Sequence, residues 1–219
     1  LCRFIDMDCL IHSGNTFAYC CNSPASMHDV CGTTGDYAYD RDKVIEYGRQ
    51  YYNKQDPYYP QRSYRNNCVR FASQCLYAGL GDDIIAEVYP EWHCYRNNQR
   101  DPENPEEHDQ TRSWRKTNYF YRFLMDSGLA YNTTRLYSGW DLGLMAEWFQ
   151  YEPGDFLFFS NGNGADEFYH VAVVSAITEN DILFMGNTTD CFDASLTAWF
   201  QDPENQEKEV VIVCIADQG

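Results

Sequence analysis

The hydrophobic pattern of this sequence changes character at Pro153-Gly154. After that point the chain consists of short β-branched or aromatic runs separated by turn residues, namely DFLFFS, HVAVVSAIT, DILFMGNT and EVVIVCIAD. Before it, apolar residues recur at the spacing of helices. Helices early and strands late in one chain predict an α+β fold whose carboxy-terminal half is an antiparallel sheet.

Four segments of the first part have helical spacing. Asp40 and Ser113 can cap two of the helices, and Gly79 can adopt the left-handed conformation that ends another. The expected helices cover residues 41–54, 68–78, 114–126 and 142–150. Cys68 then lies in the first turn of the second helix.

The chain is strongly acidic. Its 16 Lys and Arg against 33 Asp and Glu give a net charge of −17, which repels phosphate backbones and anionic membrane surfaces. No stretch approaches the roughly 18 uninterrupted apolar residues of a membrane span. We therefore expect a soluble protein with no nucleic-acid partner and no membrane span. The carboxylates of Asp155, Asp166 and Glu167 are interpreted as solvated surface without a catalytic role.

The beginning of the chain differs from the rest. Residues 1–35 are rich in Cys, Ser, Asn and Gly without a regular period, which predicts a loop-rich Cys-rich arm. The main domain covers residues 36–219, and a polar stretch near 93–111 is expected to be an exposed insertion. Because the chain begins at Leu1 instead of Met, a signal peptide would already be missing from the sequence.

Ten cysteines, five of them in the Cys-rich arm, indicate an oxidising, extracellular setting and a secreted protein. Setting aside Cys68 and Cys75 leaves eight, which is compatible with four disulfides, although Cys214 can instead be a buried thiol. The arm also holds Cys and His at short spacings that zinc accepts, with disulfides favoured over zinc. We expect no metal and no cofactor at the catalytic site.

Cys68 is the candidate nucleophile. At the start of a helix, the macrodipole and the free backbone N–H groups favour a thiolate, so a lowered thiol pKa is expected. The same N–H groups can bind the oxyanion of a tetrahedral intermediate, which suits acyl transfer from an amide. Tyr64 and Asn67, just before the nucleophile, are candidates to assist at this oxyanion site.

His170 is the candidate base that takes the thiol proton and later protonates the leaving amine. It opens the run HVAVVSAIT, whose apolar residues predict a rigid platform for an imidazole. The remaining histidines lie in the Cys-rich arm or beside the polar insertion, where a ring would be poorly fixed; they are His12, His28, His93 and His108.

Asn187 is the candidate third residue of a triad with Cys68 and His170. It follows the strand DILFMG, which should pair with the His170 strand through a tight turn at Glu179-Asn180. Its amide oxygen can accept the imidazole N–H. Spacing alone leaves another interpretation open, because a helix cysteine is usually a small buried hydrophobe and a strand histidine is often a core residue.

The segment NNCVRFASQCLYAG resembles the nucleophile motif of the Putative amidase domain family, written Asp-Cys-Thr-Asn-Phe-Val-Ser-Gln-Cys-Leu. The matching residues are Cys68, Phe71, Ser73, Gln74, Cys75 and Leu76. Three later segments resemble the same family in the same order: SWRKTNYFYRFL from Ser113, PGDFLFFS from Pro153 and YHVAVVSAITENDILFMGNTTD ending at Asp190. The resemblance covers about residues 38–200.

This resemblance implies a papain-like fold akin to the NlpC-type cell-wall peptidases, with a helix-borne cysteine packed against the sheet that carries the histidine. It also implies that Cys75 faces the core and stays reduced. Two positions depart from the family pattern: Asn67 stands where the family has Asp, and Asn187-Thr188 stands where it has His-Thr. An asparagine amide can still orient an imidazole.

The sequence therefore predicts a secreted bacterial amidase or peptidase that cleaves an amide through a thioester acyl-enzyme. A peptide or a peptidoglycan-type stem peptide is the expected substrate, although a net charge of −17 disfavours approach to anionic cell-wall polymers. Two alternatives stay open. One is acyl transfer to an amine by the same residues, and the other is an inactive binding or adhesion module stapled by disulfides.

Overall fold

The computed structural model describes residues 38–59, 67–81, 89, 91–94, 110–162 and 167–217. The Cys-rich arm, most of the insertion near 93–111 and Tyr64 lie outside these residues, so what the sequence predicts for them stays a prediction. Among the described helices, none combines the length and the apolar character needed to cross a membrane.

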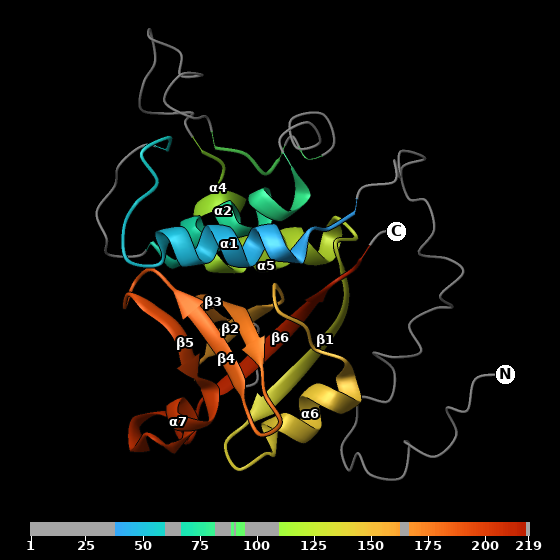
Figure 1. Cartoon of the computed structure of the whole chain (residues 1–219), viewed down its shortest axis with the longest axis vertical. Coiled ribbons are helices and arrows are strands. Elements are labelled where there is room, and N and C mark those ends of the chain that lie inside the picture. Colours follow the sequence, from blue (N-terminus) through green and yellow to red (C-terminus); the bar gives the residue numbers. More distant parts are fainter. Residues whose placement is uncertain are drawn as a thin grey trace, which may run out of the picture. The chain divides into compact units, whose positions relative to one another are not determined.

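A six-stranded antiparallel sheet, in the order β1-β6-β2-β3-β4-β5, forms the centre of the described structure (Figure 1). Its strands are β1 (Ala130–Tyr137), β2 (Phe156–Ser160), β3 (Phe168–Ile177), β4 (Ile182–Gly186), β5 (Cys191–Ser195) and β6 (Glu209–Ile215). The four predicted strand runs are β2, β3, β4 and β6, and β3 pairs with β4 as expected. The α+β prediction is confirmed.

Helices cover both sides of this sheet (Figure 1). One side has α1 (Arg41–Tyr51), α2 (Cys68–Leu80), α4 (Arg112–Arg115) and α5 (Thr117–Asp126). The other side has α6 (Leu142–Phe149), α7 (Leu196–Gln201) and the 3-10 turn η1 (Pro203–Asn205). Asp40 caps α1 as predicted, because its carboxylate accepts a 3.1 Å hydrogen bond from the Lys43 N–H.

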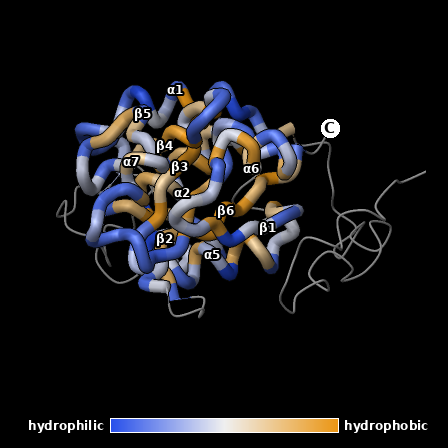
Figure 2. The backbone as a smooth tube through the Cα atoms, turned by 90° about the horizontal axis from the view of Figure 1, so that it is seen from below, coloured by the Kyte–Doolittle hydropathy of each residue, from blue (hydrophilic) through white to orange (hydrophobic). Residues whose placement is uncertain are grey.

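Alternation of the strand side chains divides the interior into two cores. In β3, Val171 and Val173 belong to a first core with α1, α2 and α5, whereas Ala172 and Val174 belong to a second core with α6 and α7. The central strands β2 and β6 are buried along their whole length, and Figure 2 shows their hydrophobic character. Burial on both faces explains why these strands are continuous apolar runs in the sequence.

The packing of α2 against α1 depends on Gly79. A Cβ atom at this position would lie 2.5 Å from Val44 and 2.6 Å from Tyr39, closer than real atoms approach. The helix continues past Gly79 to Leu80, and the next residue, Gly81, has the positive φ of 87° that favours glycine. The prediction that Gly79 ends this helix is therefore wrong, because the glycine is needed for close helix packing.

The helix expected from Ser113 is divided in two. Lys116 has extended angles, φ −126° and ψ 124°, between α4 and α5. Ser113 lies inside α4 and its hydroxyl donates to the Glu91 carbonyl, so it is not the predicted cap. The predicted end is confirmed, since α5 stops at Asp126 and Gly128 has φ 76°.

A buried ion pair ties α1 to the sheet. The carboxylate of Asp155, which is 0% exposed, accepts 3.0 Å hydrogen bonds from Arg41 and from the Ile215 N–H. Arg41 also binds the carboxylates of Glu152 and Asp217. The interpretation of Asp155 as solvated surface is therefore wrong, because this carboxylate is buried and satisfied by fixed donors.

Candidate active site

Cys68 is the first residue of α2, so the predicted nucleophile lies where the helix begins. It packs in the first core and is 5% exposed. Burial raises the pKa of its thiol, and four polar groups act to lower this pKa: the backbone N–H groups of Cys68, Val69 and Val171, and the Thr188 hydroxyl. Three elements thus meet at the thiol, namely the start of α2, the strand β3 and the turn after β4.

The pKa of the Cys68 thiol is raised above its ordinary value by burial, although the surrounding donors act to lower it. The expected low thiol pKa is therefore wrong. The helix start and its N–H groups are present, but removing a thiolate from water costs more than these donors return. Cys68 is accordingly a thiol at neutral pH, and a base must take its proton before or during attack.

His170 lies in β3, directly before the residue whose N–H acts on the Cys68 sulfur. It pairs with Phe159 of β2, and the two rings lie 5.3 Å apart at the edge of the second core. Burial lowers the pKa of His170 from its ordinary 6.5 to about 4. The imidazole is therefore neutral at pH 7 and able to accept a proton.

The end of β4 adjoins both candidate residues. The Nε2 atom of His170 lies 4.0 Å from the position that a Cβ would take at Gly186, the last residue of β4. Two residues further on, the Thr188 hydroxyl acts on the Cys68 sulfur. Imidazole and thiol adjoin the same short segment, but no hydrogen bond of the described residues joins them.

Asn187 has other partners than the predicted one. Its amide nitrogen donates to main-chain carbonyls at the end of α1, namely those of Tyr51 at 2.6 Å, Tyr52 at 3.0 Å and Lys54 at 3.1 Å. Its amide oxygen accepts a hydrogen bond from Asn67. These bonds satisfy carbonyls that a helix leaves open at its carboxyl end. Asn187 therefore fixes α1 and Asn67 relative to β4, and a bond to His170 is not among its hydrogen bonds in the described structure.

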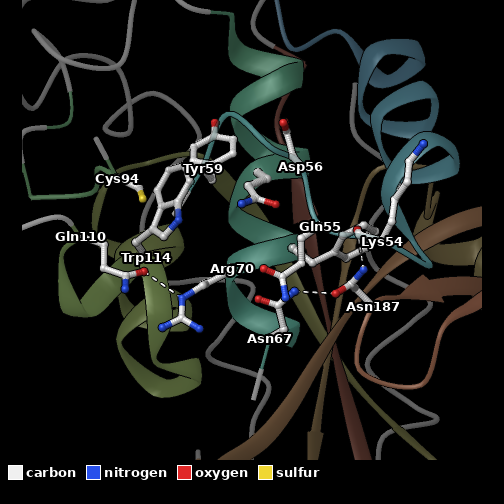
Figure 3. Close-up of a pocket in the computed structure, with 12 residues that line it drawn as sticks. Lys54, Gln55, Asp56, Tyr59, Asn67, Arg70, Cys94, Gln110, Trp114 and Asn187 are labelled. Carbon is white, nitrogen blue, oxygen red and sulfur yellow. Dashed lines mark hydrogen bonds between the residues drawn. The ribbon is translucent and has the colours of Figure 1, made fainter. Parts of the chain in front are cut away.

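A small hollow lies beside the two asparagines (Figure 3). Its lining comes from the loop after α1, from one face of α2 and from Trp114 of α4. Amide side chains supply much of the lining, and the Nε atom of Arg70 donates to Gln110 at 2.9 Å. Asn67, which directly precedes Cys68, lines this hollow, whereas Cys68 and His170 are not among the described residues that line it.

Several cysteines of the described residues are thiols. Cys75 is 0% exposed and free, in agreement with what the family resemblance implies. Cys214 is a buried free thiol, which is the alternative that the sequence left open for it. Cys191 is also free, so all eight remaining cysteines do not pair in four disulfides. Where the structure describes the chain, no group of three His, Cys, Asp or Glu side chains could hold a metal ion.

These features define an α+β protein in which a helix-borne thiol lies against an antiparallel sheet. The sequence matches the Putative amidase domain family over residues 38–211, which is most of the chain, and the chain therefore belongs to this family. Membership of this family indicates amide hydrolysis as the broad class of reaction, without indicating the catalytic residues or the substrate. No curated protein sequence and no solved structure matches the chain.

Two contacts of Cys68 were not found by reasoning from the sequence. Thr188 carried a signal, because it follows Asn187 where the family pattern has a Thr, but no role was assigned to it. The Val171 N–H carried none, because a main-chain donor has no side-chain signature. The two departures from the family pattern, Asn67 and Asn187, are hydrogen-bonded to each other, which spacing could not show across 120 residues.

Proposed function

We propose that the chain is a cysteine-dependent amide hydrolase in which Cys68 is the nucleophile and His170 its base. The observation that carries this proposal is the position of Cys68 at the start of α2, against the antiparallel sheet, in a member of the Putative amidase domain family. The backbone N–H groups near the thiol also act to lower its pKa. Once the sulfur bonds to a carbonyl carbon, the same donors can stabilise the oxyanion.

Proton transfer from Cys68 to His170 is proposed to accompany attack. The thiol starts protonated because burial raises its pKa, and the imidazole starts neutral because burial lowers its pKa to about 4. Because no hydrogen bond of the described residues joins the two side chains, the imidazole must approach the sulfur for this transfer. Phe159 pairs with His170 and Ser160 with Phe168, so Tyr169 is an extra residue in β3, and such a bulge can redirect the side chain beside it.

The proposed reaction has two steps. The Cys68 sulfur bonds to the amide carbonyl, the C–N bond breaks, and the proton held by His170 passes to the leaving amine, which leaves a thioester. Water then adds to the thioester, gives a proton to His170 and releases the carboxylic acid, and the thiol is restored. Asn67 is proposed to donate its remaining amide hydrogen to the oxyanion, and Tyr64 stays a candidate for the same role. Asn187 would act through Asn67 as a positioning residue.

The finer classification is also a proposal. A papain-like arrangement is supported by α2, which bears Cys68 and packs against β3 of an antiparallel sheet in the first core. A secreted protein is proposed from the five cysteines of the Cys-rich arm, because so many cysteines in 31 residues are typical of oxidising compartments. A peptide is the proposed substrate.

Incubation of the chain with a peptide library and with digested cell wall in isotopically labelled water tests this function. Hydrolysis places the label in a new carboxylate, whereas an added amine would divert the acyl group if the chain is a transferase. Cys68→Ala should lose both products. Cys191→Ala, which removes a half-buried thiol instead of the buried one, should keep them. Labelled products that persist in Cys68→Ala would contradict the proposal.

A further inference from the structure

The side chain of Trp114 in α4 buries a hydrogen-bond donor, its indole N–H. The side chain is 0% exposed, and among the described residues nothing accepts a hydrogen bond from its Nε1 atom. Buried polar groups in folded proteins are almost always hydrogen-bonded, either to the protein or to an ordered water. This N–H therefore indicates an ordered water as its acceptor.

The neighbouring Trp92 shows that the same aromatic cluster can satisfy an indole by itself. Its ring lies 4.8 Å from that of Trp114 and is also 0% exposed. The Nε1 atom of Trp92 donates to the Ser73 hydroxyl at 3.3 Å, and this hydroxyl donates to the main-chain carbonyl of Trp114 at 3.2 Å. Burial among aromatic rings is therefore not by itself the reason why the Trp114 donor lacks an acceptor among the described residues.

The ring of Trp114 lines the small hollow beside Asn67 and Asn187. Figure 3 shows its indole nitrogen on the edge of the ring that is nearer to Arg70, another lining residue. The open space inside the hollow has the volume of about one water molecule, which is too small for a substrate side chain. The buried donor and the size of the hollow thus indicate the same small ligand independently.

The lining of the hollow favours a neutral ligand over an ion. Its charged residues, Lys54, Arg70 and Asp56, all have partners of their own. Side-chain amides make up much of the remaining lining, and they present donors and acceptors without a net charge. Water is itself a donor and an acceptor, so it matches such a lining.

Two glutamine amides supply the further partners of a bound water, which needs roughly two to four. The Oε1 atom of Gln74 in α2 accepts from the Tyr47 hydroxyl at 3.2 Å, and no acceptor for its amide N–H groups is found among the described residues. The Oε1 atom of Gln110 accepts from Arg70 at 2.9 Å and has a second lone pair. Because both glutamines line the hollow, donors and an acceptor are available in addition to Trp114.

We propose that the hollow binds one ordered water, which accepts the indole N–H of Trp114 and bonds to the amides of Gln74 and Gln110. This water joins α2, which bears Cys68, to α4 and to the β-bridge between Gln110 and Cys94. Gln74 matches the nucleophile motif of the family, and holding the water gives it a role that is structural and not catalytic. The inference does not depend on the proposed amide hydrolysis, so the two can fail separately.

A crystal structure of the full chain, at a resolution that shows ordered waters, tests this proposal. One water peak should lie in the hollow, about 2.9 Å from the Nε1 atom of Trp114. A hollow without a peak, a protein atom that accepts the indole N–H, or a peak with the anomalous signal of a chloride ion would overturn the proposal.

Two matched variants test whether the Trp114 donor holds the water. Trp114→Phe keeps an aromatic ring and removes the N–H, so the peak should lose at least half of its occupancy. Trp92→Phe removes an equally buried N–H whose acceptor is Ser73, and the peak should then be unchanged. An undiminished peak in Trp114→Phe, or an equal loss in both variants, would overturn the assignment to Trp114. The wild-type structure alone decides whether the water is present, so a variant that does not fold leaves the test intact.

Discussion

Cys68 and His170 adjoin the same end of β4, yet their surroundings differ in kind. Donors from α2, β3 and the turn after β4 act on the thiol, whereas the imidazole packs against Phe159 and its pKa is shifted by burial alone. Donors favour a negative charge, and an apolar surrounding disfavours a positive one. The difference indicates that the polar groups near the sulfur partly offset the cost of a buried negative charge, whereas no such group offsets the cost of an imidazolium.

Among the variants considered, removal of the His170 imidazole is expected to lower activity most. His170→Ala should lower kcat for amide hydrolysis about a thousandfold, because the buried thiol then has no base. In the wild type, kcat should fall only as the pH drops toward about 4, where the imidazole becomes charged. Rates measured from pH 3 to 9 check both expectations. A variant with unchanged kcat would show that another group accepts the thiol proton.

Truncation of Asn187, which precedes the turn residue Thr188 beside Cys68, should lower the stability of the protein. Asn187→Ala breaks the four hydrogen bonds that join it to Asn67 and to the carbonyls at and after the end of α1, so the free energy of unfolding should fall by about 3 kcal/mol. Asn205→Ala is the matched control, because Asn205 is also buried but bonds only Trp199 and Lys208. Its loss should be about 1 kcal/mol. Urea unfolding of both variants measures the difference, and equal losses would contradict the linking role of Asn187.

The apolar surroundings of His170 should be detectable in the pH dependence of the free energy of unfolding. The pKa of His170 is lowered from 6.5 to about 4, so between these values the unfolded chain binds the proton more readily. The contribution of the neutral imidazole is complete above pH 6.5 and is lost as the pH falls toward 4. With partial exposure taken into account, the loss should be about 2 kcal/mol. His170→Phe should abolish this part of the pH dependence, and an unchanged dependence would contradict a buried neutral imidazole.

The smallest expected effect on kcat is that of Thr188, and the neighbouring Thr189 provides its control. The Thr188 hydroxyl acts on the Cys68 sulfur, whereas the Thr189 hydroxyl donates to the Cys191 sulfur at 3.6 Å. Thr188→Val should lower kcat by about fivefold, as the loss of one hydrogen bond to a developing thiolate predicts. Thr189→Val should leave kcat unchanged. If the two variants behave alike, the Thr188 hydroxyl has no specific part in preparing the sulfur.

The central strands could be predicted from the sequence, and the edge strands could not. β2 and β6 are buried on both faces and are continuous apolar runs, whereas β1 (AYNTTRLY) and β5 (CFDAS) lie at the two edges of the sheet and are mostly half-buried. An edge strand has too few apolar residues for a clear period, and β5 also contains Asp193 at φ 57°. Both edge strands were therefore missing from the prediction.

The candidate site was predictable where the signal is local. A cysteine at a helix start and a histidine in an apolar strand are visible as short patterns, and both elements form as expected. The contacts that set their chemistry are not local. The bond between Asn67 and Asn187 joins residues 120 positions apart, and the burial that raises the pKa of Cys68 depends on how β3 and the turn after β4 pack on α2.

Mass spectrometry of the chain, quenched with acid during turnover of a peptide amide that it cleaves, tests the role of Cys68 most directly. If Cys68 attacks the carbonyl, the proteolytic fragment that contains Cys68 should gain the mass of the acyl group, bound through a thioester that hydroxylamine removes. The adduct should form more slowly in His170→Ala. An acyl group on a different residue, or turnover by Cys68→Ala with no adduct on any residue, would contradict nucleophilic catalysis by Cys68.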